Sequence, residues 1–173
     1  MEYKLYHYCL DNFDDTGFGC SYRNIQTILS AYKKYYDESI KVPDIRHILE
    51  YFNKKYKQIK NKRELWIEPY HVSQYINKEY DIKSKITLYI IKNNNVSNIL
   101  KTSIDVYLKD KTYHKFEDLE QLFRNHFCKS KLPIIIDNGI YSYCIGNINK
   151  NEVTIIDPHT CKDEDVIKIK DFS

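Results

Sequence analysis

A cysteine placed between a glycine turn and the start of a helix is the residue of this chain best suited to nucleophilic chemistry. Cys20 follows Gly17 and Gly19, and the residues after it have the apolar spacing of an amphipathic helix. The unpaired N–H groups and the positive end of the helix dipole would face the sulfur, and such a setting lowers the pKa of a cysteine from its free value of about 8.5. We therefore expect Cys20 to ionise readily and to act as a nucleophile.

The sequence also holds a base for this nucleophile and a carboxylate to orient the base. Asp157 and His159 flank a proline directly after the apolar run 153–156. Side chains alternate along an extended chain, so both residues should point to the same side. Asp157 could then accept a hydrogen bond from one ring nitrogen of His159 while the other nitrogen faces the thiol. A thiol, an imidazole and a carboxylate are the components of a cysteine hydrolase.

The elements that must position these residues follow from the hydrophobic spacing. The predicted helices cover residues 20–36, 45–56, 69–80 and 116–127, and the predicted strands cover residues 85–91, 132–136, 140–147, 152–156 and 166–169. Helices followed by strands are typical of an α+β domain in which an N-terminal helix packs against an antiparallel sheet. A chain of 173 residues is most simply one domain, here residues 1–173.

Composition narrows the function classes. The net charge of +3 is too small to predict a nucleic-acid partner, and the sequence has neither a signal-peptide pattern nor an apolar run of membrane-spanning length. The five cysteines form an odd set without a CxxC pair, which argues against a disulfide framework and against a zinc site. We therefore expect a cytoplasmic protein in a reducing compartment, with free thiols, no metal and no cofactor.

Two fragments resemble the signature motifs of the ubiquitin-fold-modifier-specific cysteine proteases. Residues 14–27 (DDTGFGCSYRNIQT) are similar to the D-x-G-W-G-C-x-Y-R-x-x-Q-T nucleophile motif of that family, with Phe18 in place of the tryptophan. Residues 155–159 (IIDPH) resemble its D-P-H signature, and Tyr8 stands where the family has a tyrosine whose hydroxyl lines the oxyanion hole. The resemblance implies a papain-like α+β fold with Cys20, Asp157 and His159 as the catalytic triad.

The same resemblance implies a substrate and a rim that recognises it. The substrate would be a ubiquitin-like modifier, most simply the ubiquitin-fold modifier, cleaved after its C-terminal glycine during precursor maturation, deconjugation or both. Gly17, Phe18 and Gly19 would form a slot narrow enough to admit only a glycine-ended tail. Asn138 and Gly139 stand where the family has a glycine-rich turn and would form the opposite rim. Conjugates of the modifier, and an adaptor at the endoplasmic reticulum, are the expected partners.

Three alternatives stay open at this point. Autophagy-related cysteine proteases share a glycine-flanked cysteine and a D-P-H pair but process a different modifier. A zinc-finger-bearing relative of the ubiquitin-fold-modifier-specific proteases cuts ubiquitin chains. A catalytically silent module could keep the fold and only bind a ubiquitin-like partner. Cleavage of different modifier precursors separates the first two from the leading hypothesis, and binding that survives Cys20→Ala without wild-type turnover would favour the third.

Overall fold

The computed structural model describes residues 1–55, 66–86, 116–150 and 152–171. Its helical elements are η1 (Leu10–Asn12), α1 (Cys20–Tyr35), α2 (Ile45–Lys55), α3 (Pro69–Tyr80), α5 (Phe116–Phe127) and η2 (Asp163–Asp165). The strands are β1 (Ile134–Asp137), β2 (Ser142–Asn149), β3 (Glu152–Ile156) and β4 (Ile167–Asp171). The four predicted helices are confirmed over the described residues. Of the strand predicted at 85–91, residues 85 and 86 are not in a strand and the others lie outside the described residues.

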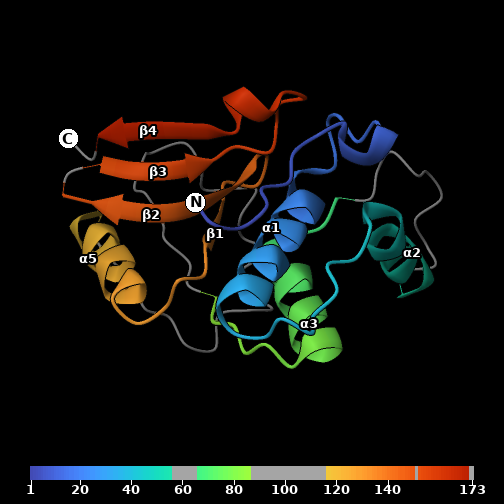
Figure 1. The fold of residues 1–173 in the computed structure, drawn as a ribbon, viewed down its shortest axis with the longest axis horizontal. Coiled ribbons are helices and arrows are strands. Elements are labelled where there is room, and N and C mark those ends of the chain that lie inside the picture. Colours follow the sequence, from blue (N-terminus) through green and yellow to red (C-terminus); the bar gives the residue numbers. More distant parts are fainter. Residues whose placement is uncertain (56–65, 87–115, 151, 172–173) are drawn as a thin grey trace, which may run out of the picture.

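The four C-terminal strands form one antiparallel sheet in the order β1-β2-β3-β4 (Figure 1). The predicted start of the second of these strands, at residue 140, was wrong by two residues. The side-chain oxygen of Asn138 accepts the backbone N–H groups of Ile140 and Tyr141, at 3.0 and 2.8 Å, and this closes a turn before β2 begins. Apart from such shifts at strand ends, the predicted α+β fold with an antiparallel sheet is confirmed.

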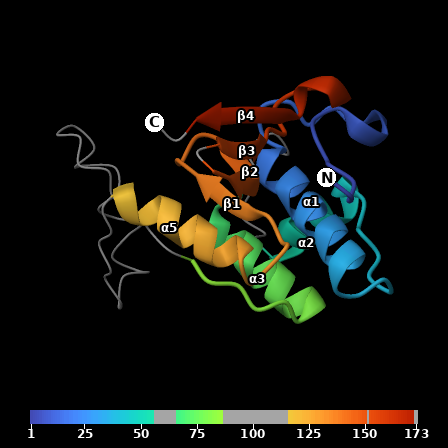
Figure 2. The ribbon, with the colours of Figure 1, turned by 60° about the vertical axis from the view of Figure 1, so that its left-hand side comes forward.

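Helices cover both faces of this sheet (Figures 1 and 2). Ile28 and Ala31 of α1 pack against Cys144 of β2. Phe123 of α5 packs against Ile145, the next residue of the same strand. Because neighbouring side chains of a strand point to opposite faces, α1 and α5 lie on opposite sides of the sheet.

The remaining side of α1 is buried by the other helices. Tyr22 of α1 meets Phe52 of α2 edge to face, with ring centroids 5.9 Å apart, and Phe52 also contacts Tyr75 of α3. Together with the sheet and the N-terminal segment, whose backbone donates to Thr27 and Ser30, these helices bury every residue of α1 from Cys20 to Ala31. The helix that carries Cys20 is therefore held between the sheet and a helical layer. Among the described residues, no helix combines the length and the apolar character needed to cross a membrane.

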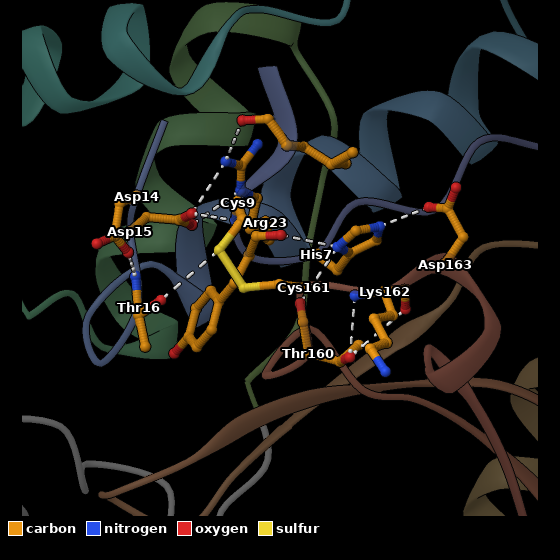
Figure 3. The surroundings of a disulfide bond; sticks show 12 residues. His7, Cys9, Asp14, Asp15, Thr16, Arg23, Thr160, Cys161, Lys162 and Asp163 are labelled. Atoms are coloured by element: carbon orange, nitrogen blue, oxygen red, sulfur yellow. Dashed lines mark hydrogen bonds and ion pairs between the residues drawn. A yellow bond between two sulfur atoms is a disulfide. The ribbon is translucent and has the colours of Figure 1, made fainter. Parts of the chain in front are cut away.

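A disulfide joins the N-terminal segment to the loop after β3 (Figure 3). It links Cys9 and Cys161, whose Cα atoms lie 5.2 Å apart. The backbone N–H of Tyr8 donates to the carbonyl of Pro158 at 2.9 Å, which aligns the two segments side by side. The prediction of free cysteines without a disulfide was therefore wrong for this pair. An odd number of cysteines still allows one bridge, and the fold brings together two cysteines that lie far apart in the sequence.

Loss of this disulfide is expected to lower the free energy of unfolding by about 2–4 kcal/mol, because a crosslink spanning 152 residues restricts the unfolded chain. Urea unfolding of the Cys9→Ser/Cys161→Ser double variant, compared with the unreduced wild type, measures the effect. Cys128→Ser is the matched control, since Cys128 is free and exposed. Identical unfolding curves for the double variant and an oxidised wild type would contradict the expectation.

Candidate active site

The thiol of Cys20 lies at the N-terminus of α1, as the sequence predicts. The side chain is buried, with 3% of the residue exposed. The turn before it is closed by the backbone N–H groups of Phe18 and Gly19, which donate to the carbonyl of Asp15 at 3.2 and 2.9 Å. The helix then begins with the N–H of Arg23 donating to the carbonyl of Gly19 at 2.9 Å. This arrangement places the sulfur at the positive end of the helix dipole.

The two glycines of the turn are required for different reasons. Gly17 has a φ of +86°, a left-handed backbone conformation that residues other than glycine rarely adopt. At Gly19 a Cβ atom would lie 2.0 Å from a carboxylate oxygen of Asp15. The close approach expected at Gly19 is therefore present, and the structure identifies the Asp15 side chain as the group that Gly19 leaves room for. Gly17 and Phe18 line a cavity of about 810 Å³ between this turn and α2.

A buried ion pair fixes the same turn to α1 (Figure 3). The guanidinium of Arg23 donates to both carboxylate oxygens of Asp15, at 2.8 and 3.0 Å, and both side chains are fully buried. Arg23 also donates to the carbonyl of Leu10 and to the side chain of Gln26, both at 3.1 Å. Asp15 in turn accepts the backbone N–H of Cys9 at 3.0 Å. One ion pair therefore holds the nucleophile turn and the segment that carries Tyr8, and sequence reasoning missed it.

The structure brings Asp157 and His159 together just beyond the end of β3. One carboxylate oxygen of Asp157 accepts both the backbone N–H of His159, at 2.9 Å, and its ring Nδ1–H, at 2.7 Å. The backbone N–H of Asp157 donates to the carbonyl of Val166 at 2.7 Å, which anchors the turn to the β4 side. The expected pairing is therefore present. A tight turn produces it, whereas the sequence argument relied on strand alternation.

Three tyrosine rings enclose the imidazole of His159. The rings of Tyr8, Tyr141 and Tyr143 have centroids 5.4, 5.2 and 4.8 Å from the centroid of the imidazole. The second ring nitrogen, Nε2, is buried and has no hydrogen-bond partner of good geometry among the described residues. The Cys20 thiol lies close enough to the imidazole for each group to change the pKa of the other. This nitrogen is thus available to exchange a proton with the thiol.

The electrostatics of the site favour a thiolate beside an imidazolium. Burial by itself would raise the pKa of the Cys20 thiol, but hydrogen bonding with His159 and with the backbone of Ser142 outweighs burial, and the pKa is lowered. Burial would lower the pKa of His159, yet its interactions with Cys20 and Asp157 raise it. The pKa of Tyr8 is raised, first by burial and then by the charge of Cys20. The Tyr8 hydroxyl therefore stays protonated and can donate a hydrogen bond.

Alkylation of Cys20 should reveal this ion pair as a function of pH. We expect the rate of reaction with iodoacetamide to stay near its plateau at pH values where an ordinary thiol, with a pKa of about 8.5, is mostly protonated. His159→Ala should move the midpoint to higher pH, because the hydrogen bond and positive charge that favour the thiolate are lost. Mass spectrometry of the Cys20 peptide measures the rate. The urea-unfolded protein is the control, and equal midpoints in folded and unfolded protein would contradict the expectation.

The expected substrate rim lies in the turn between β1 and β2. Asp137 holds this turn by accepting the N–H of Gly139 at 2.7 Å, and Gly139 has a left-handed φ of +84°. Asn138 and Gly139 are exposed. Tyr141, two residues after Gly139, is one of the three tyrosines whose rings contact His159, so the turn lies beside the imidazole.

A further contact between α1 and the sheet lies next to the thiol. The side-chain N–H of Asn24 donates to the hydroxyl of Ser142 at 3.0 Å, and both residues are buried. Ser142 is the residue whose backbone also interacts with Cys20. Asn24 therefore fixes the start of β2 against the helix that carries the nucleophile. The sequence motif contains Asn24, but nothing in its spacing indicates a partner on a distant strand.

A cysteine at the start of a central helix, beside a histidine–aspartate pair just beyond the end of an antiparallel strand, is the arrangement found in papain-like cysteine peptidases. Comparisons with known proteins give the family. The model of peptidase family C78 matches residues 1–172, and the chain belongs to this family.

The relatives that match have names in keeping with this family. A probable Ufm1-specific protease of Oryza sativa subsp. japonica is 29% identical over 96% of this chain, and Ufm1-specific protease 2 of Homo sapiens is 28% identical over 95% of it. The crystal structure of UfSP from C. elegans superposes with a TM-score of 0.63 at 23% identity and covers 98% of the chain. The chain spans only 24%, 32% and 30% of these three proteins. The resemblance inferred from the motifs and the papain-like fold are confirmed.

Proposed function

We propose that this chain is a thiol-dependent peptidase or isopeptidase that cleaves after the C-terminal glycine of the ubiquitin-fold modifier Ufm1. Membership of peptidase family C78 and the names of its relatives support the proposal. The observation that carries it is the position of His159. One ring nitrogen of His159 is held by Asp157 at 2.7 Å, and its imidazole interacts with the thiol of Cys20.

The geometry supports a two-step hydrolysis. The Cys20 thiolate attacks the carbonyl carbon of the terminal glycine, and the imidazolium of His159 gives its proton to the leaving amine. A thioester then joins the modifier to Cys20. His159, now neutral, takes a proton from water, whose oxygen attacks the thioester, and the thiolate leaves as the glycine carboxylate forms. Asp157 holds the tautomer and orientation of the imidazole through both steps.

The negative oxygen that forms in each step needs hydrogen-bond donors, and Tyr8 is the proposed one. Its side chain is buried beside Cys20, and its hydroxyl stays protonated because its pKa is raised. The pairing of Tyr8 with Pro158 and the adjacent Cys9–Cys161 disulfide hold this tyrosine next to the His159 turn. A donor fixed in advance stabilises the transition state without a cost of reorganisation.

Tyr8→Phe is therefore expected to lower kcat by about 10²–10³-fold, the usual effect of losing one oxyanion donor. Alkylation of Cys20 should persist in this variant, because the ring still packs against His159. Tyr32→Phe, in the last turn of α1, is the control and should have the kcat of the wild type. A wild-type kcat in Tyr8→Phe would show that the Tyr8 hydroxyl does not stabilise the oxyanion.

The proposed path of the modifier tail runs between two loops. Gly17, Phe18 and Gly19 directly precede the nucleophile, and the cavity beside Gly17 and Phe18 provides room for a side chain of the modifier. Asn138 and Gly139 would form the other side of this path, because they lie near Tyr141, whose ring contacts His159. A tail that ends in glycine, without a Cβ atom, fits the narrowest point of such a path.

The proposal also includes a cytoplasmic location and recruitment by an adaptor at the endoplasmic reticulum. Fractionation of cells that produce the tagged chain tests the location, and loss of its membrane-bound fraction after removal of a candidate adaptor tests the recruitment. The redox state of Cys9 and Cys161 should be measured in the same cells, because the disulfide places oxidised cysteines next to the site.

Cleavage of a panel of modifier precursors tests the proposed function. Ufm1, ubiquitin and the modifier of the autophagy-related proteases would each carry a short extension after the C-terminal glycine, and mass spectrometry would identify the products. We expect cleavage of the Ufm1 precursor after its glycine. Cleavage of either other precursor alone would favour one of the alternative proteases. Binding of Ufm1 without cleavage of any precursor would favour a silent binding module.

A further inference from the structure

Lys168 lies beside the proposed catalytic carboxylate, although it belongs to another strand and to no sequence motif. The register pairs Lys168 of β4 with Ile155 of β3. Asp157 follows two residues after Ile155, and its backbone N–H bonds the carbonyl of Val166, two residues before Lys168. Because side chains alternate along strands, Lys168 and Asp157 are diagonal neighbours on one face of the sheet. The ammonium of Lys168 forms an ion pair with Asp157.

The two oxygens of the carboxylate face different partners. Oδ1 of Asp157 accepts both hydrogen bonds from His159, at 2.9 and 2.7 Å, whereas Oδ2 accepts the bond from Lys168. Asp157 is only 6% exposed, so water can satisfy little of its charge. A carboxylate that is buried this far needs a partner for each oxygen, because an unpaired buried charge is costly.

We propose that Lys168 is a positioning residue of the catalytic site that acts through Asp157. Its ammonium holds the carboxylate with Oδ1 directed at His159, and it offsets part of the negative charge that the imidazole meets. The inference rests on the proposed function, since it concerns the same triad. Lys168 itself does not touch the reacting atoms.

The sign of the electrostatic effect follows from the groups around the triad. The groups that face His159 are Tyr141 of the β1–β2 turn, Tyr143 of β2, Tyr8 of the N-terminal segment and Cys20 of α1. Asp165 of η2 acts on Lys168. Removal of the ammonium makes the potential at Cys20 and His159 more negative. Both groups then hold their protons to higher pH, so both limbs of a bell-shaped rate profile move to higher pH.

The test compares three substitutions in β4. Lys168→Met removes the charge and keeps most of the stem, Lys168→Arg keeps the charge, and Lys170→Met is the matched control on the same face of the strand. The readouts are kcat/KM for the Ufm1 precursor and the rate of Cys20 alkylation, both measured against pH. Thermal unfolding establishes that each variant is folded, and Lys168→Gln replaces Lys168→Met if that variant is not.

For Lys168→Met we expect kcat/KM to fall about tenfold and both limbs to move up by about half a pH unit at low salt. The shift should shrink at high salt, because the Lys168 side chain is 48% exposed and its charge is screened. Lys168→Arg should restore the positions of the limbs, and Lys170→Met should match the wild type. These results would support the proposal.

A Lys168→Met profile that superimposes on the wild type would overturn the proposal, and so would a shift of equal size in Lys170→Met or Lys168→Arg. This failure differs from failure of the proposed function. If the wild type cleaves no modifier, the proposed function fails, and the alkylation profiles still decide the role of Lys168.

Discussion

His159→Ala is expected to lower kcat/KM for a Ufm1 precursor by about 10⁴-fold or more, as removal of a triad member does in other hydrolases. The variant loses the proton donor for the leaving amine, and it also loses the group whose hydrogen bond and charge lower the pKa of Cys20. Asp157→Asn should cost a similar factor, because an amide in place of the carboxylate favours the wrong tautomer of the imidazole. Steady-state cleavage assays with purified variants measure both effects.

The chain offers a matched histidine control for this experiment. His47 is exposed on α2, and His47→Ala should leave kcat/KM unchanged. The combined variant His159→Ala/Asp157→Asn should be scarcely slower than His159→Ala alone, because Asp157 acts through the histidine. Activity of His159→Ala within tenfold of the wild type would show that another group supplies the proton.

Arg23→Met is expected to lower the free energy of unfolding by about 3–5 kcal/mol, the usual cost of leaving one partner of a buried ion pair uncompensated. Both Arg23 and Asp15 are fully buried, and the guanidinium also donates to Leu10 and Gln26. Urea unfolding followed by circular dichroism measures the change. The nucleophile turn should be disturbed as well, because the backbone carbonyl of Asp15 accepts the N–H groups that close it and the carboxylate of the same residue is held by Arg23.

Two comparisons separate the buried ion pair from a general effect of removing an arginine. Arg46→Met breaks an ion pair with Asp44 that is half exposed, at 3.3 Å, and should cost less than about 1 kcal/mol. The double variant Asp15→Leu/Arg23→Met should be more stable than Arg23→Met, because no charge is then left buried without a partner. Equal losses for Arg23→Met and Arg46→Met would contradict this account of the turn.

Local sequence patterns were sufficient to predict most elements and the proposed catalytic residues. The apolar spacing in α1 predicts a helix that starts at Cys20, because apolar residues recur there at helical intervals. The polar residues between them are buried as well, which an amphipathic pattern does not predict. The β-branched run in β3 likewise predicts a strand that ends before Asp157. Cys20, His159 and Tyr8 each lie within or near a motif that resembles the family, so their assembly could be anticipated before their contacts were known.

The contacts that support this site could not be predicted, because they join segments far apart in the sequence. The Cys9–Cys161 disulfide depends on the Tyr8 segment lying beside Pro158, which only the completed fold brings about. Lys168 reaches Asp157 through the β3–β4 register, and a sequence fixes such a register only indirectly. From the sequence alone, Lys168 cannot be distinguished from an ordinary surface lysine, because its contact with Asp157 is not known.

Reaction with a Ufm1 probe that carries an electrophile in place of its C-terminal carboxylate tests the central claim most directly. The measurement is the mass of the intact protein after incubation, followed by peptide mapping of the modified residue. We expect one probe per chain, attached to Cys20, with rapid labelling of the wild type and none of Cys20→Ala. A folded wild-type chain whose Cys20 stays unlabelled, or labelling that maps to Cys128 at the same rate, would contradict the assignment of Cys20 as the nucleophile.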